Sequence, residues 1–183
     1  AHPPANTLLG TVKKLAVTLG GLAAVRGIIG LSDELTQTTA RLNLMNDNLQ
    51  TTEQLQNMIF AANQRSRGSY LQTADTVAKL GLLAKNAFSS NAETIAFVEQ
   101  LNKHFAIVGT SQEGRAAAML QLTQAMSSGV LRGEELNSIF DQAPTIIQTI
   151  ADYLGVTVGE VKELAQEGDI TATIVKNALL SAA

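Results

Sequence analysis

The stretch IADYLGVTVGEVKELAQEGDITA, residues 150–172, has the spacing of two short helices joined by a tight turn. Ala151, Gly155, Val161 and Leu164 stand where a DNA-reading helix-turn-helix places the residues that hold its two helices together. Such positions specify how two helices pack and nothing more. The stretch therefore predicts a helical fold, and its outward face decides whether the unit reads DNA.

That outward face is acidic. The second helix, beginning at Val158, would expose Gly159, Glu160, Lys162, Glu163, Gln166 and Glu167. Three acids against one lysine, within a segment 133–183 that holds eight acids and two lysines, would repel phosphates. We interpret the unit as architectural, and a helix-turn-helix DNA-binding protein is the first alternative.

Helix starts recur along the chain. Five hydroxyl residues are each followed three positions later by Gln or Glu, the spacing of a capping box. The pairs are Thr51 with Gln54, Ser69 with Gln72, Ser90 with Glu93, Thr110 with Glu113, and Thr157 with Glu160. Pro144 is placed to open a helix over 145–154.

Glycines are spaced as helix ends, because glycine adopts the left-handed conformation of a helix C-terminus without steric cost. The predicted stops are Gly68, Gly81, Gly109, Gly129, Gly155 and Gly168. No stretch alternates apolar and polar residues as a strand would, so we expect no sheet.

The pattern as a whole predicts an all-α fold, a compact bundle of about seven to nine short helices. Apolar residues recur at helical intervals, so each helix is expected to bury one face. The predicted core positions are Leu55, Ile59, Val77, Ile95, Leu101, Leu122, Leu136, Ile139, Ile146, Leu154, Val161 and Leu164.

Composition agrees with a fold held by packing. Hydrophobic residues make up 45% of the chain and charged residues 16%, below the roughly 25% of ordinary soluble domains. The chain has no cysteine, which excludes disulfides, thiolate zinc sites and thiol catalysis.

The N-terminal part differs from the rest. We interpret residues 1–6, AHPPAN, as a disordered lead-in or cloning remnant, and residues 7–31 as an apolar helical arm rich in glycine and alanine. The arm's longest charge-free stretch, 15–25, is shorter than the roughly 20 residues of a membrane span. An ordinary core helix and a self-associating or membrane-active helix both fit it. The chain lacks an initial methionine and stops within a predicted helix, so we expect a fragment of a longer protein.

The residues offer little chemistry. His104 is expected to be a cation favoured by the negative end of a helix, without a metal partner. The densest acids, Glu134, Glu135 and Asp141, are better explained by the first turn of a helix than by the paired carboxylates of a wall hydrolase, which is the second alternative.

The only basic spot with an aromatic residue is 63–70, NQRSRGSY, and its two arginines would give little nucleic-acid affinity. Neither a nucleophile elbow nor a phosphate-binding loop is present in the sequence. We therefore predict no catalytic, cofactor-binding or metal-ligating residues, and no enzyme activity.

A longer similarity covers about four fifths of the chain, from residue 32 to the end. Its most specific pieces are ARLNLMND at 40–47, QLTQAMSSGVLRGEELNSIFDQAP at 121–144 and LGVTVGEVKELAQEGDITA at 154–172. In these pieces the chain resembles the conserved amino-terminal region of tape measure proteins of tailed phages and prophages. Under this resemblance residues 32–183 are the conserved helical tape measure region.

The resemblance implies a structural protein rather than an enzyme. In that family a long helical chain lies inside the tail tube, sets tail length during assembly, and leaves ahead of the DNA. The implied partners are tail tube, tail tip and tail assembly chaperone proteins and further copies of the chain, with no specific nucleic acid. The implied location is the virion tail, and the host cytoplasm during assembly. The short helices here, which are separated by glycines, would form a folded module on the long helical chain that sets tail length.

Overall fold

The computed structural model describes residues 22–183, with side chains described from residue 30 onward. Two compact units divide between Ala40 and Arg41. The predicted lead-in 1–6 and most of the predicted arm, 7–21, lie outside the described residues.

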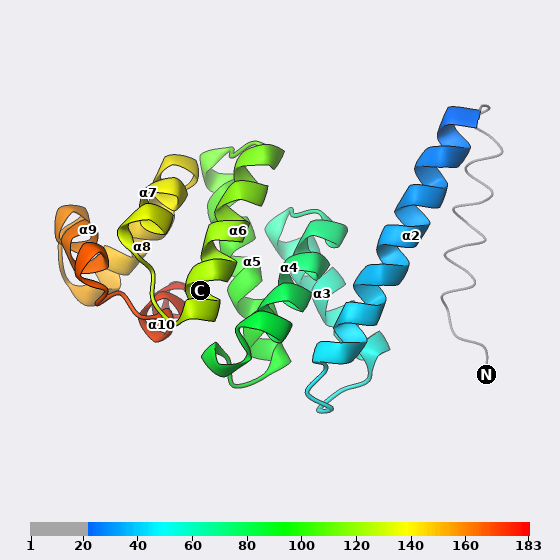
Figure 1. Ribbon diagram of the computed structural model, residues 1–183, viewed down its shortest axis with the longest axis horizontal. Coiled ribbons are helices and arrows are strands. Elements are labelled where there is room, and N and C mark those ends of the chain that lie inside the picture. Colours follow the sequence, from blue (N-terminus) through cyan, green and yellow to red (C-terminus); the bar gives the residue numbers. More distant parts are fainter. Residues whose placement is uncertain (1–21) are drawn as a thin grey trace. The chain divides into compact units, whose positions relative to one another are not determined.

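Helices account for nearly all of the described chain (Figure 1). Across residues 22–183 there is no strand, only an isolated bridge, which confirms the predicted all-α class. The helix α2 runs through residue 31, where composition had suggested the end of an arm. The helices are α2 Leu22–Met45, α3 Thr52–Ser66, α4 Tyr70–Leu83, α5 Asn91–Val108, α6 Gln112–Ser128, α7 Gly133–Gln142, α8 Pro144–Leu154, α9 Val158–Glu167 and α10 Ala172–Ser181, with a short 3-10 turn at Lys85–Ala87.

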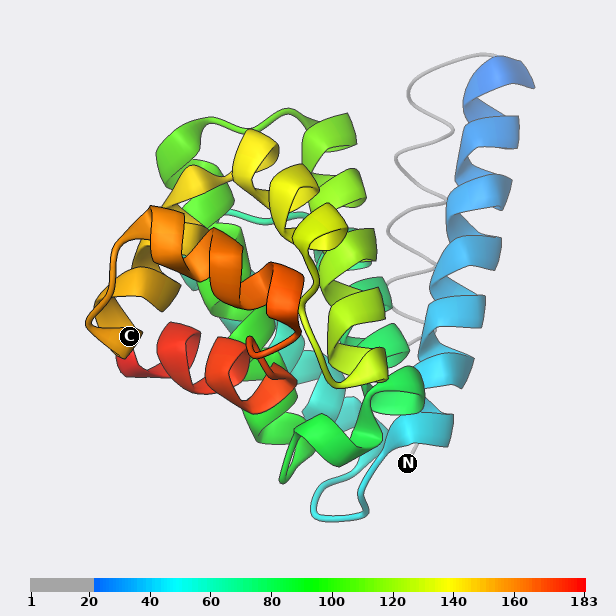
Figure 2. The same cartoon turned by 60° about the vertical axis from the view of Figure 1, so that its left-hand side comes forward.

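Within residues 41–183, α5 is the helix that the others surround. It contacts α3, α4, α8 and α10, and its aromatic side chains Phe97 and Phe105 are completely buried. The helices α7 to α10, yellow to red in Figure 2, gather beside α5 and α6. A buried central helix of 18 residues therefore organises the core.

Ten predicted core positions are buried: Leu55, Ile59, Val77, Ile95, Leu101, Leu122, Leu136, Ile139, Ile146 and Val161. The prediction was wrong for Leu154 and Leu164, which are only partly buried against that core. Leu154 is the last residue of α8, and α9 buries the stripe of Val161 and Ala165 instead of Leu164.

The predicted capping boxes form completely at two sites. The hydroxyls of Thr51 and Thr157 each accept a hydrogen bond from the backbone N–H three residues on. In return, the side-chain oxygens of Gln54 and Glu160 accept from the backbone N–H of the cap residue. Ser69 is the residue before α4 but makes no side-chain cap. The expected box at Thr110 was wrong by one residue, because Ser111 caps α6.

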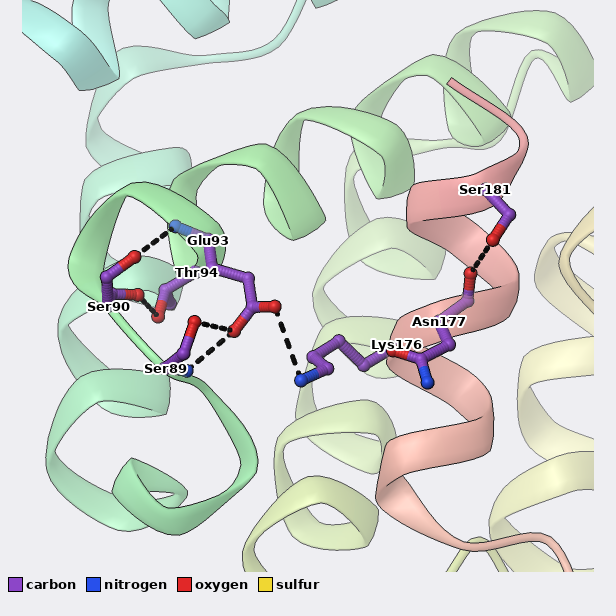
Figure 3. A network of polar contacts seen from close by, with 7 residues as sticks. All are labelled: Ser89, Ser90, Glu93, Thr94, Lys176, Asn177 and Ser181. Atoms are coloured by element: carbon purple, nitrogen blue, oxygen red, sulfur yellow. Dashed lines mark hydrogen bonds and ion pairs between the residues drawn. The ribbon is translucent and has the colours of Figure 1, made fainter.

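At Ser90 only half of the predicted capping box forms, because the Glu93 side chain bonds to Ser89 instead. Ser90 Oγ accepts from the Glu93 backbone N–H at 3.2 Å. The Glu93 carboxylate, however, accepts from the N–H and hydroxyl of Ser89, at 2.6 and 2.8 Å, and pairs with Lys176 of α10 at 3.3 Å (Figure 3). The start of α5 is thereby tied to α10.

Four of the six predicted glycine stops are left-handed helix ends: Gly109, Gly129, Gly155 and Gly168. At the end of α3 the left-handed residue is Arg67, with φ of 53°, and not Gly68. Gly81 is not a stop. It lies inside α4, where Met45 of α2 packs so closely that a side chain has no room.

The chain enters and leaves the segment of α7, α8 and α9 at one place. Two linkers, 129–132 and 168–171, lie antiparallel through an isolated bridge between Val130 and Thr171. Leu131 N–H donates to Ile170 O, and Ala172 N–H to Gly129 O, both at 2.8 Å. The Leu131 and Ile170 side chains are completely buried. We call residues 133–167 the inserted unit and these two segments the paired linkers.

A pair of glycine substitutions tests the packing of α4 on α2. A Cβ at Gly81 would overlap Met45 Cε and lie 2.9 Å from Met45 Cβ, so Gly81→Ala is expected to lower the free energy of unfolding by about 1–3 kcal/mol despite its better helix propensity. A Cβ at Gly159 in α9 would make only an ordinary contact of 3.8 Å with Thr157 Oγ1, so Gly159→Ala should be neutral or stabilising. Urea unfolding followed by circular dichroism measures both. A Gly81→Ala protein as stable as the wild type would contradict the close contact.

Candidate functional site

The helix-turn-helix-like unit forms as the sequence predicted. The helix α8 ends at Gly155 with φ of 70°, and α9 begins after the Thr157 cap. Val156 N–H donates to Ala151 O at 3.0 Å, which closes the turn. Ala151 and Val161 are completely buried, so they hold the two helices together.

The outward face of α9 is acidic, as expected. Glu163, Gln166 and Glu167 are exposed. The single cation of the helix, Lys162, is partly buried and places Nζ 4.1 Å from the centre of the Phe140 ring in α7. This lysine is therefore engaged within the fold rather than free to meet a phosphate.

Glu160 belongs to the helix cap. Its carboxylate accepts from the Thr157 N–H at 2.7 Å and from the Thr157 hydroxyl at 2.8 Å. These two bonds lower the pKa of Glu160. Glu160 is therefore ionised at neutral pH, and a negative charge on this face is the opposite of what a DNA-reading helix needs.

The three acids of the hydrolase alternative do not flank one cleft. Glu134 lies in the first turn of α7 and Asp141 in its last, about 10 Å further along the helix axis. The Glu135 carboxylate accepts from the Arg132 N–H at 3.1 Å and so caps α7. A surface hollow between α7 and α9 is lined by Glu134 and Glu135 but not by Asp141. As predicted, Glu134 and Glu135 occupy a helix start.

His104 corrects our expectation of a cation. It is partly buried in α5, and Nδ1 lies 2.9 Å from Thr145 Oγ1 in the first turn of α8. Burial lowers the pKa of His104, so the ring is neutral at pH 7. Over the described part of the chain, no three His, Cys, Asp or Glu side chains gather closely enough to hold a metal ion.

The basic spot 63–70 is largely used inside the fold. Arg65 Nε and Nη2 donate to the two oxygens of Glu99 in α5, at 3.0 and 2.7 Å. Lys103 adds a contact to Glu99 at 3.2 Å, and the Arg65 bonds together with Lys103 lower the pKa of this carboxyl. Arg67 is exposed. One arginine outside the pairing with Glu99 is a weak basis for nucleic-acid binding.

The sequence did not predict a pair of hydrogen bonds that joins the loop after α2 to the start of α5; we call it the clamp of Asp47 on Asn91. The Asp47 carboxylate accepts from Asn91 N–H, and the Asn91 side-chain oxygen accepts from Asp47 N–H, each at 2.8 Å. Burial raises the pKa of Asp47, but bonds from the Asn91 and Leu49 backbones outweigh burial and lower it overall. No sequence signal links residues 44 positions apart.

These features define an all-α protein with a core built on α5 and a helix-turn-helix-like unit whose outward face is acidic. The sequence model of the tape measure protein family matches residues 26–183, nearly the whole described chain. The chain therefore belongs to the tape measure protein family, which consists of structural proteins of the phage tail. The resemblance found in the sequence is confirmed, and the matched region begins six residues earlier than expected.

No curated protein and no solved structure matched the chain. In the part of the chain that the structure describes, no helix has the length and apolar character of a membrane span.

The buried histidine predicts a pH dependence. Its lowered folded pKa means that the unfolded chain binds the proton more tightly, so stability is complete above about pH 6.5 and falls as the pH drops through the folded pKa. His104→Asn, which can keep the bond to Thr145, should remove this slope between about pH 6.5 and 5, above the range in which carboxyls titrate. Urea unfolding at a series of pH values measures it. Equal slopes in both proteins would exclude His104 as the cause.

The acidic face predicts an absence of DNA binding. Labelled duplex DNA at low salt should show no change in fluorescence anisotropy with the 183-residue chain, because the exposed acids of α9 repel phosphates. Tight binding that weakens steeply as salt is added would show that the helix-turn-helix-like unit reads DNA after all.

Proposed function

We propose that residues 32–183 are a folded module of a tape measure protein, the protein that sets tail length, and that this module supports tail assembly through protein contacts. The observation that carries this proposal is the family match over residues 26–183. It is supported by the compact arrangement of α3–α10, because helices of ten to eighteen residues that pack on one another do not form a continuous rod. In this proposal the module is attached to the long helical part of the protein, and that helical part sets the tail length.

The proposed partners are tail tube, tail tip and tail assembly chaperone proteins, together with further copies of the chain. Exposed apolar side chains offer contact area for such proteins, since Leu44, Leu49 and Ile107 are each at least three quarters exposed. The proposed location is the virion tail, reached from the host cytoplasm during assembly. Contact of residues 7–31 with a membrane stays an open part of this proposal.

The role is one of structure and not of catalysis. Three polar side chains tie helices to one another: Glu99 to α3, Glu93 to α10 and His104 to α8. Such contacts hold the helices in fixed positions, which gives partner proteins a stable surface to bind. This reading of the residues agrees with a family of structural proteins.

Measuring both tail length and tail number distinguishes the role of the folded module from that of the long helical part of the protein. In the phage that encodes the full-length protein, Leu101→Ala should destabilise the module by about 2–5 kcal/mol, because this core side chain is completely buried. We expect fewer assembled tails of unchanged length, counted and measured by electron microscopy. The exposed substitution Gln64→Ala in α3 is the control and should leave both quantities unchanged.

An in-frame deletion elsewhere in the parent protein, within a predicted helical rod, should shorten the tails by about 1.5 Å per residue removed. Tails whose length changes with Leu101→Ala would contradict the separation of the folded module from the long helical part. Normal numbers of tails after loss of the folded module would contradict its role in assembly.

A further inference from the structure

The chain enters and leaves the inserted unit at a single place. Gly129 and Ala172 are joined by a backbone hydrogen bond of 2.8 Å, so the two ends of the unit lie side by side. The unit packs on its neighbours through α7 against α6 and α8 against α5 and α10, and its unfolding would leave the paired linkers joined at its base. This topology is typical of a segment that folds and unfolds cooperatively.

Charge is strongly unbalanced inside the unit. Residues 133–167 hold seven acids and one basic residue, Lys162, which gives a net charge of −6. Residues 41–128 hold seven basic and six acidic residues, close to neutrality. Like charges at this density repel one another in the compact state, and the repulsion is relieved when the segment expands.

Acids also stand at the wrong ends of the unit's helices. Asp141, Asp152 and Glu167 lie in the last turns of α7, α8 and α9, and none of these turns contains a basic residue. The C-terminal end of a helix carries partial negative charge, so an acid there is destabilising. Each helix has only ten or eleven residues, a length at which isolated helices are marginal in water.

Ion pairs hold the rest of the fold but not this unit. The five ion pairs among the described side chains join Arg41 and Lys79 to Asp75, Arg65 and Lys103 to Glu99, and Lys176 to Glu93. All of them lie outside residues 133–167. Apolar side chains such as Leu136, Ile139 and Ile146 hold the unit in place, helped by hydrogen bonds from the Thr110 hydroxyl to Gln142 O and between His104 and Thr145.

From these observations we propose that residues 133–167 form an electrostatically weakened unit that unfolds as one piece while α3 to α6 stay folded, with the paired linkers as its base. The unit is a conformational device whose opening is controlled by ionic strength. Salt screens the repulsion among its acids and closes it.

Native-state hydrogen exchange of the 183-residue chain at increasing urea tests this directly. Amides within α8 and α9 should share one free energy of opening, lower than that of amides in the middle of α5. Raising sodium chloride from about 20 mM to 500 mM should slow exchange in the unit roughly fivefold and leave α5 unchanged.

A charge variant provides an independent readout. Glu167→Gln removes one acid from the unit and from the C-terminal end of α9, so it should slow exchange of the unit by roughly threefold at low salt and reduce its salt dependence. Glu34→Gln, the same substitution at an exposed position of α2, is the matched control and should leave the unit's exchange unchanged.

Two results would overturn the proposal. One is a single free energy of opening shared by α8, α9 and the middle of α5, which would mean that the unit unfolds only with the whole. The other is equal slowing of exchange in the unit and in α5 when salt is added. This would mean that charge repulsion does not destabilise the inserted unit more than the rest of the fold.

Discussion

Burial of α5 is the constraint on which the rest of residues 41–183 depends. A helix enclosed on several sides must bury some polar side chains, and α5 buries Asn91, Thr94, Glu99, Gln100 and Asn102. A buried charge is tolerated only where it is paired and hydrogen-bonded. Arg65 and Lys103 supply this for Glu99, and Thr73 accepts from Asn102 at 3.0 Å. Among the described residues no buried side-chain polar atom lacks a partner. The core is therefore specified by polar contacts as much as by apolar volume.

Local sequence rules predicted the elements well because their causes are local. A capping box such as Thr157 with Glu160 depends on residues three positions apart, and Pro144 opens α8 by its own fixed backbone angle. Where the rules failed, a distant residue decided the outcome. Gly81 would end a helix in isolation, but α4 continues because that glycine admits Met45. His104 was expected to be a cation at a helix end, but it lies partly buried against α8, and burial lowers its pKa.

The candidate site shows the same division. The acidic character of α9 could be predicted, because charges on a helix surface follow from spacing alone. The stacking of Lys162 on Phe140, the pairing of Arg65 with Glu99 and the clamp of Asp47 on Asn91 could not. Each joins residues from different helices or loops, and a single sequence carries no record of those contacts. The family match adds what neither spacing nor geometry supplies, namely that this chain belongs to a family of phage tail proteins.

The paired linkers have a consequence for any chain that measures distance. Between Gly129 and Ala172 the polypeptide makes a closed excursion and returns to within one hydrogen bond of its starting point. Laid out as a continuous helix, those residues would span about 65 Å. In the folded state their contour contributes almost nothing to end-to-end extension. The number of residues and the end-to-end distance are therefore uncoupled in this part of the protein, and only unfolding of the segment between the paired linkers would extend it.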